Sequence, residues 1–257
     1  GLGDVYKRQT STHAIGEAFR AIRYGYADAI IAGGAEAAIN EVGVAGFANC
    51  KALTTCEDPE SACSPFDARR SGFVMGEGAG ILVLEEYEHA VGRGAKIYGE
   101  VCGYGATCDA FHITAPRPDG AAGAEAIRLA LQEAGYQAGQ TVYINAHGTS
   151  THLNDAGETA AVKTVFGPHA DHLAMSSTKS MTGHMLGAAG AVEAVACLKA
   201  LNEGILPPPI NLREPDPACD LNYIPNQAVA AQVDLALSNS LGFGGHNACI
   251  AFRKVKL

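Results

Sequence analysis

Tryptophan is absent from this chain of 257 residues, and aromatic residues make up only 7% of it. Proteins that hold single-stranded nucleic acid stack its bases on aromatic side chains, so this composition argues against such a platform. Basic residues are also scarce, because 18 Lys and Arg stand against 27 Asp and Glu and leave a formal net charge of −9. Binding to a phosphate backbone needs a basic surface. We therefore expect no nucleic-acid partner.

Long apolar runs and paired cysteines are missing as well. No stretch approaches the length of about 18 apolar residues that a membrane-spanning helix needs, so no membrane partner is expected. The first nine residues lack the apolar stretch of a secretion signal. The eight cysteines include no C-x-x-C pair, which favours reduced thiols in a cytoplasmic protein over a disulfide framework. His147 and His152 lack a third ligand at a suitable spacing, so we expect no metal site.

Hydrophobic residues make up 47% of the chain, which is typical of a protein that buries a core. Segments with the apolar spacing of helices alternate with short apolar runs typical of buried strands. Helices are predicted over 11–25, 127–134, 157–166 and 188–202, and strands over 29–32, 79–84, 97–105, 142–145, 235–238 and 248–252. This alternation predicts a layered α/β fold in which helices cover the sheets.

Local signals add four expectations. Ser11 or Thr12 is the expected N-cap of the first helix. The stretch 43–72 is rich in Gly, Cys and Pro and is interpreted as a long functional loop. Polar, glycine-flanked residues 92–96 are the natural boundary between two subdomains. Residues 188–202 are apolar on nearly every face, which predicts a helix buried on all sides.

The first of three polar clusters follows the strand predicted over 142–145. His147 stands just after this strand, at the end where open α/β sheets hold their ligands. Thr149 and Thr151 add hydroxyl groups to the same small region. A single histidine in such a place is more often a structural residue. The first cluster therefore indicates a catalytic site only in combination with the second and third polar clusters.

The second and third clusters carry complementary chemistry. Lys179 lies five residues before His184, and a nearby lysine keeps an imidazole neutral by like-charge repulsion. A neutral imidazole can polarise a carbonyl group by hydrogen bonding. In residues 239–245 three glycines surround Phe243, an arrangement suited to an oxyanion hole. The S-x-x-K pattern that ends at Lys179 lacks the companion K-T-G motif, which argues against a serine β-lactam-binding enzyme. Residues 76–80 do not form the G-x-G-x-x-G motif, so no dinucleotide-binding fingerprint is present.

Three long motifs resemble the β-ketoacyl-acyl-carrier-protein synthases, and among them the type II enzymes of fatty-acid elongation. They are NAHGTST over 145–151, STKSMTGHMLGAAG over 177–190 and NSLGFGG over 239–245, supported by PFD at 65–67 and GFVMGEGAGILVLE at 72–85. The resemblance covers residues 10–257 and implies a thiolase-like α/β fold, layered αβαβα. It also implies that 10–94 is the end of an incomplete N-terminal half, and that 95–257 is a complete C-terminal half.

The resemblance also implies an acyltransferase activity and names its residues. In this family a cysteine is acylated, and two histidines then assist the decarboxylation of a malonyl thioester, whose carbanion attacks the acyl-enzyme. By resemblance His147 and His184 are that pair. Lys179 matches the active-site lysine, and Glu193 matches the buried glutamate that contacts it. Phe243 matches the gating phenylalanine.

Substrates in this family are carried on the phosphopantetheine of acyl carrier protein, and no further cofactor is expected. Thr114, Thr149 and Thr151 match positions that line the pantetheine tunnel. The resemblance further implies a homodimer and a cytoplasmic location, with a plastid as the open alternative.

Carrier docking requires a local basic patch, because carrier proteins are acidic and the whole chain is acidic too. Lys51, Arg69 and Arg70 are the candidates, and Lys51 matches a family position that helps to bind the carrier. For the two arginines, an ordinary role as solvated surface charges stays open.

The chain departs from the family at its front. The nucleophilic cysteine should stand just before the segment that begins at Thr10, and counting back places Arg8 there, followed by Gln9. Because residues 1–9 do not resemble the expected apolar strand, we hypothesise that they are a non-native scar. A natural variant with arginine at this position is the alternative. In either case the chain as written is expected not to form an acyl-enzyme and to be an inactive fragment.

Two other functions stay open at this point. A polyketide ketosynthase, or the chain-length-factor-like subunit that lacks the cysteine, would keep the fold and change the product. A non-catalytic thiolase-fold binding module is a different class of function. Decarboxylation of a malonyl thioester by the chain would separate a catalytic protein from a binding module.

Overall fold

A computed structural model of the protein describes residues 8–255, apart from the side chains of residues 171 and 172. Most of the expected scar, residues 1–7, lies outside the described residues. The helices are α1 Thr10–Arg23, α2 Glu41–Asn49, α3 Tyr87–Gly92, α4 Ala121–Glu133, α5 His152–Phe166, α6 Lys179–Thr182 and α7 Ala189–Glu203, with 3-10 helices η2 Gly167–His172 and η3 Leu186–Ala188. The strands are β1 Ala29–Glu36, β2 Gly78–Glu85, β3 Glu100–Cys108, β4 Val142–Asn145, β5 Ala174–Ser176, β6 Ile205–Leu206, β7 Val229–Ala230, β8 Leu235–Gly242 and β9 His246–Arg253. Within residues 8–255 none of the helices has both the length and the apolar character needed to span a membrane.

A five-stranded mixed sheet is the centre of the fold. Its strand order is β3-β9-β8-β4-β5, with β9 antiparallel to both of its neighbours and β4 parallel to both β8 and β5. Strands β1 and β2 form a separate antiparallel pair, and β6 and β7 form a third, very short one. The parallel arrangement places the carboxyl ends of β4 and β5 at one edge of the sheet, next to the loops that follow them.

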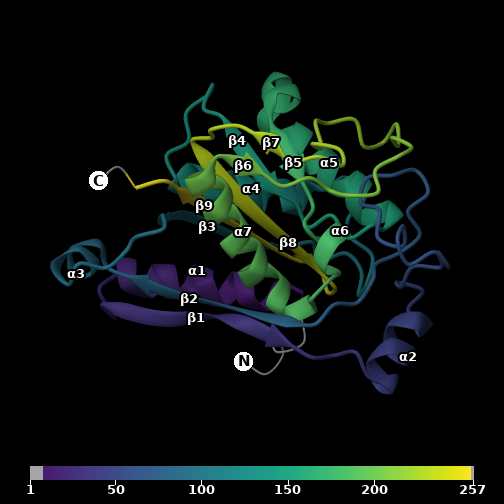
Figure 1. Cartoon of the computed structure of the whole chain (residues 1–257), viewed down its shortest axis with the longest axis horizontal. Coiled ribbons are helices and arrows are strands. Elements are labelled where there is room, and N and C mark those ends of the chain that lie inside the picture. Colours follow the sequence, from purple (N-terminus) through teal and green to yellow (C-terminus); the bar gives the residue numbers. More distant parts are fainter. Residues whose placement is uncertain (1–7, 256–257) are drawn as a thin grey trace.

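The layers follow from which faces are apolar. Helices α1 and α7 lie between the β1–β2 pair and the large sheet, and α4 and α5 cover the other face of the large sheet (Figure 1). Strand β9 shows the two-sided burial, since Ile250 packs towards α1 and α7 while Cys249 and Ala251 pack towards α4 and α5. The described residues thus form four layers, in the order β, α, β, α.

Three of the local expectations were wrong, two of them at α1 and α2. Helix α1 begins at Thr10, with Gln9 at its N-cap position, so Ser11 and Thr12 lie inside the helix. Both are buried, and the hydroxyl of Ser11 accepts from the backbone N–H of Ala191 at 2.9 Å instead of capping its own helix. Residues 43–49 of the stretch expected to be a loop belong to helix α2.

The predicted strands at β1 and β2 are present, but they are not buried on both faces. Ile31 is 74% exposed, and its neighbours across the pair, Ile81 and Val83, are 59% and 63% exposed. The reason is that α1 and α7 cover one face of the pair, and no helix within residues 8–255 covers the other. Helix α7 is also open on one side, where Val195 is 41% exposed.

Candidate active site

His147 is held by a carboxylate that the sequence analysis missed. The residue follows β4, is fully buried, and donates its backbone N–H to Oε1 of Glu158 at 2.8 Å, while Gly148 donates to Oε2 at 2.8 Å. Asn239 on β8 also donates to Glu158 at 3.2 Å. Burial raises the pKa of Glu158. The one signal in the sequence was an acidic residue among the apolar positions of the helix predicted over 157–166.

His184 lies against His147 with a defined orientation. The two ring centroids are 5.2 Å apart and the rings are nearly perpendicular, at 84°. Nδ1 of His184 accepts the backbone N–H of Leu186 at 3.2 Å, so in the neutral ring the proton is on Nε2. Among the described residues, neither Nε2 of His184 nor either ring nitrogen of His147 has a hydrogen-bond partner. The pair can therefore offer hydrogen bonds to a small molecule.

Lys179 and Glu193 form the expected contact. Lys179 starts α6, Glu193 lies in α7, and both side chains are almost completely buried as an ion pair. Burial raises the pKa of Glu193 to about 7, and the neighbouring ammonium group limits this rise. The pair places a positive charge close to both imidazoles without exposing it to water.

Both histidines are held neutral. Burial lowers the pKa of His147 and of His184 well below the usual value, and the positive charges of Lys179 and Arg8 lower both further. The expected effect of the lysine on the imidazole is therefore present in the structure. A neutral imidazole in a water-poor site is a strong hydrogen-bond donor to a developing oxyanion.

The low pKa values of the histidines predict a pH dependence of stability. Because the unfolded chain binds more protons than the folded one below about pH 6.5, the free energy of unfolding should fall there as the pH drops. The slope is up to about 1.4 kcal/mol per pH unit for each histidine. Glu193 acts with the opposite sign, because its raised pKa removes stability as the pH rises from about 4.5 to about 7.

Thermal unfolding of the chain and of a His147→Gln/His184→Gln double variant separates these contributions, since Glu193 is common to both proteins. Between about pH 7.5 and about pH 5.5 the unmodified chain is expected to lose about 2.7 kcal/mol more than the double variant. Equal losses in the two proteins would contradict the assignment of buried neutral histidines.

Arg8 occupies the place that the sequence comparison assigned to the nucleophile. Its guanidinium carbon lies 3.8 Å from the ring centre of Phe243 and 4.9 Å from that of Phe73, whose ring is 5.2 Å from that of His184. The side chain is only 7% exposed, and Nε and Nη2 have no hydrogen-bond partner among the described residues. Burial lowers the pKa of Arg8 to about 9. A buried cation therefore stands at the position where the resemblance would place the nucleophilic thiol.

Phe243 lies at the turn between β8 and β9. Gly244 and Gly245 follow it with φ angles of +84° and +77°, a backbone that glycine adopts without strain. A second aromatic residue that the sequence analysis missed, Phe47 of α2, lies 6.4 Å from Phe243 and 5.3 Å from Phe73 between ring centres. It was missed because its segment was interpreted as a loop. Three phenylalanine rings thus close the site on the side of Arg8.

The threonines fall into two groups. Thr149 is fully buried, and its hydroxyl lies 3.0 Å from that of Thr151. Thr114 is partly buried in the loop after β3, where the backbone oxygen of its neighbour Ile113 accepts from Gly244 at 2.6 Å. The structure therefore brings Thr149 and Thr151 together and places the loop of Thr114 against the Phe243 turn.

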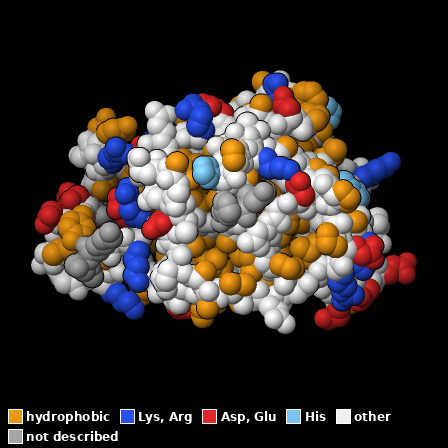
Figure 2. Space-filling view, turned by 90° about the horizontal axis from the view of Figure 1, so that it is seen from above, with side chains coloured by type: hydrophobic (Ala, Val, Ile, Leu, Met, Phe, Trp, Pro, Cys, Tyr) orange, Lys and Arg blue, Asp and Glu red, His pale blue; other side chains and the backbone are white. Residues whose placement is uncertain are grey.

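The docking candidates do not share one environment. Lys51 is exposed just after α2, and Arg69 is exposed but paired with Asp67 at 2.8 Å. Arg70 was wrongly expected at a docking surface, because it is 2% exposed and binds Asp216 at 2.6 Å. In the face shown in Figure 2, hydrophobic side chains gather across the lower middle, and basic and acidic side chains are mixed nearer the edges.

The eight cysteines are all free thiols, and none lies at the N-terminus of α1. Cys63 lies beside the site, where its thiol donates to the backbone oxygen of Lys179 at 3.2 Å. Burial raises its pKa to about 12, which leaves almost no thiolate at neutral pH. Cys63 is therefore unsuited to replace the missing nucleophile.

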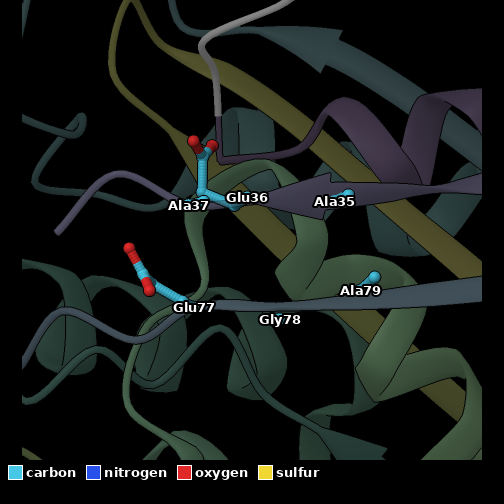
Figure 3. Close-up of a pocket in the computed structure, with 6 residues that line it drawn as sticks. All are labelled: Ala35, Glu36, Ala37, Glu77, Gly78 and Ala79. Atoms are coloured by element: carbon cyan, nitrogen blue, oxygen red, sulfur yellow. The ribbon is translucent and has the colours of Figure 1, made fainter.

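A separate hollow at the ends of β1 and β2 contains no predicted site residue. Figure 3 shows the carboxylates of Glu36 and Glu77 at its rim. Glu36 accepts the backbone N–H of Gly187 at 3.1 Å, and Glu77 accepts that of Ile39 at 2.8 Å. Both carboxylates thus have structural roles at this place.

Comparison with known proteins relates the chain to one family. The N-terminal domain model of the β-ketoacyl synthases matches residues 9–90, and their C-terminal domain model matches 98–213. The 3-oxoacyl-[acyl-carrier-protein] synthase 2 of Synechocystis sp. is 57% identical over 244 residues, 95% of this chain and 59% of that protein. The enzyme of the same name from Staphylococcus aureus is 51% identical, with the same two coverages. The chain thus spans about three fifths of the length of these relatives.

Solved ketosynthase structures share the fold. A ketosynthase bound to a hexaketide, in complex with its type II polyketide acyl-carrier protein, matches with a TM-score of 0.95 and 42% identity over 98% of this chain and 62% of that one. A β-ketoacyl synthase from Burkholderia phymatum matches with a TM-score of 0.91 and 40% identity over 98% and 60%. These matches confirm the expected thiolase-like fold. The chain belongs to the β-ketoacyl synthase family of acyltransferases.

Proposed function

We propose that the chain is part of a 3-oxoacyl-[acyl-carrier-protein] synthase of fatty-acid elongation. In place of the fully inactive fragment expected from the sequence, we propose that it retains decarboxylation of malonyl thioesters without forming an acyl-enzyme. The observation that carries the proposal is the pair His147 and His184, two neutral, buried imidazoles whose ring centres lie 5.2 Å apart. Three of their four ring nitrogens have no hydrogen-bond partner among the described residues. The buried Lys179, held by Glu193, supports it, because burial lowers the pKa of both imidazoles and the positive charge of Lys179 lowers it further.

The chemistry follows from these groups. When a malonyl thioester binds with its thioester oxygen at the histidines, the bond between the α-carbon and the carboxylate breaks and carbon dioxide leaves. The electron pair moves onto the thioester oxygen as an enolate, which hydrogen bonds from the imidazoles stabilise. In a complete enzyme of the family this carbon attacks the acyl-cysteine. With Arg8 in that place, the enolate takes a proton from water and gives an acetyl thioester.

Incubation with malonyl-pantetheine, followed by mass spectrometry of both protein and product, tests this proposal. We expect acetyl-pantetheine and an unmodified protein mass. His184→Ala should reduce the rate at least about 100-fold, because it removes a hydrogen-bond donor to the oxyanion. Acetyl-pantetheine formation at the same rate in His184→Ala, or a stable thioester on any of the eight cysteines, would refute the proposal.

Acyl carrier protein is the proposed partner, and its phosphopantetheine carries the substrate; no further cofactor or metal is invoked. The exposed Lys51 would contact the acidic carrier, with Arg69 in a minor role because Asp67 already pairs with it. In the same assay Lys51→Glu should slow turnover of the carrier-bound substrate and spare free malonyl-pantetheine. A homodimer and a cytoplasmic or plastid location complete the proposal by analogy with the family.

A polyketide ketosynthase or chain-length-factor-like subunit is the second candidate function. The structural match to a polyketide ketosynthase at 42% identity favours it, as does the ketosynthase/chain-length factor of ishigamide synthesis, also at 42%. The curated synthase 2 relatives are more similar in sequence, at 57% and 51% identity, and support the fatty-acid assignment.

If malonyl-pantetheine binds but is not decarboxylated, the chain is instead a binding module.

A further inference from the structure

The loop that carries His147, Thr149 and Thr151 contains a backbone conformation that needs support. Ser150 has a φ of +66°, in the left-handed region that residues other than glycine seldom occupy. Such a conformation costs about 1 kcal/mol or more and persists only where neighbouring groups fix it. The groups that fix it identify what positions the site.

Segment 64–72, distant in sequence, binds this loop directly. The backbone N–H of Ser64 donates to Oγ of Ser150 at 3.0 Å, and the backbone N–H of Gly72 donates to its carbonyl oxygen at 2.9 Å. The left-handed residue is therefore held from both its side chain and its backbone. Each of these two bonds comes from a backbone donor, so neither would be lost by a conservative side-chain change in the segment.

Arg70 makes the side-chain contacts of the same segment. Its Nε donates to the carbonyl oxygen of Thr151 at 3.2 Å, and its Nη2 donates to that of His152 at 3.1 Å. Its charge is balanced by Asp216 at 2.6 Å and by Asp155 at 3.6 Å. A planar guanidinium presents its donors in a rigid fork that fits two consecutive carbonyl groups, whereas the compact ammonium group of a lysine does not fix that geometry.

The position of this cation is unusual for a residue with only a general stabilising role. Arg70 lies at the N-terminus of α5, where the helix dipole disfavours positive charge. Two carboxylates are needed to hold it there, and one of them, Asp155, belongs to the first turn of the helix itself. The burial of a cation at this helix end is explained by the two carbonyl groups that Arg70 binds. These groups belong to the last residues of the loop that carries His147 and Thr149.

We propose that Arg70 is a positioning residue, which fixes loop 147–152 so that His147 and the Thr149 and Thr151 hydroxyls meet a pantetheine-borne thioester in one geometry. The assignment of the thioester rests on the proposed function. Arg70 itself does not contact substrate, since the guanidinium is buried behind the loop that it holds.

Hydrogen exchange of the whole chain tests the positioning role without activity. In Arg70→Lys the backbone amides of residues 148–152 should exchange at least about 10-fold faster, because the forked contact to two carbonyl groups is lost. Asp216→Asn, which weakens the hold on Arg70 from the surface, should show the same local change to a smaller degree. Arg128→Met removes an exposed arginine paired with Glu125 on α4 and is the matched control.

A second control separates positioning from general destabilisation. Ile127→Val removes a methyl group from the core between α4 and the sheet. It should change amide hydrogen exchange throughout the fold, without a selective effect on residues 148–152. Uniform acceleration in Arg70→Lys, like that of Ile127→Val, would overturn the proposal, as would unchanged exchange at 148–152. This outcome is independent of catalysis, so the absence of decarboxylation by the unmodified chain would refute the proposed function alone.

Where decarboxylation is observed, the split of its kinetic constants adds a further readout. Arg70→Lys should raise KM for malonyl-pantetheine about 10-fold, since the threonine hydroxyls lose their fixed position. A purely structural role would reduce the amount of active protein, which lowers kcat and leaves KM unchanged. That pattern would also overturn the proposal.

Discussion

An Arg8→Cys variant is expected to form an acyl thioester with acyl-pantetheine, where the unmodified chain forms none. Residue 8 directly precedes Gln9, the N-cap residue of α1, so a thiol there would lie close to the positive end of the helix. Thiols in such places have pKa values of about 7 or lower, which raises the thiolate share at neutral pH from about 3% to about half. The thiolate attacks the thioester carbonyl, and the pantetheine thiol leaves.

The surroundings of Arg8 favour the substitution of this residue by cysteine. The guanidinium is buried between Phe243 and Phe73, and two of its nitrogens have no hydrogen-bond partner among the described residues. Its removal therefore also removes a buried charge that is only partly compensated. Intact-mass spectrometry should find one acyl group per chain. The smaller side chain also leaves room beside His184 for an acyl group.

Three exposed cysteines provide an internal baseline for the experiment. Cys50, Cys56 and Cys108 are accessible in the unmodified chain, so any reaction at them is seen in both proteins. Arg8→Ser removes the same charge without adding a thiol and should stay unmodified. Peptide mapping that places the acyl group only on an exposed cysteine, or finds none, would contradict the assignment of position 8 to the nucleophile.

Much of the site could be predicted from the sequence because its residues stand in long local motifs. His147 follows a strand, His184 follows Lys179 at a fixed spacing, and Phe243 lies among glycines in a turn, so each is recognisable within about ten residues of chain. The strands β8 and β9 were equally clear, since apolar runs flank that turn. Local pattern and structure agree at these elements, whereas the local N-cap signal at Ser11 and Thr12 was wrong because both side chains are buried against other elements.

The missed features depend on groups far apart in the sequence. In the sequence Arg70 is indistinguishable from a surface charge, because the carboxylate that binds it, Asp216, is 146 residues away. In the sequence Glu158 resembles an ordinary charged residue of a helix. Only the structure shows that two backbone N–H groups of the His147 loop donate to it. The β1 and β2 strands are apolar on both faces, yet one face is exposed because coverage depends on other layers. Burial is a tertiary property, and a sequence pattern shows only which faces are able to be buried.

The second large effect is expected from Glu193→Ala. This change leaves the ammonium group of Lys179 buried without its partner, and breaking a buried ion pair in this way costs about 3–5 kcal/mol. For a chain of this length that loss corresponds to a fall in Tm of about 10 °C. Lys179→Met should cost less near neutral pH, because the pKa of Glu193 is already raised to about 7 and the carboxyl group can take up a proton.

The same helix supplies the control. Glu203 pairs with Lys199 at the exposed end of α7, so Glu203→Ala removes a carboxylate from an ion pair in water, where such pairs contribute little. Thermal unfolding of the three variants at about pH 7 should therefore rank Glu193→Ala as the least stable, Lys179→Met next, and Glu203→Ala close to the unmodified chain. If Glu193→Ala is no less stable than Glu203→Ala, the buried pair of Lys179 and Glu193 does not hold α6 against α7.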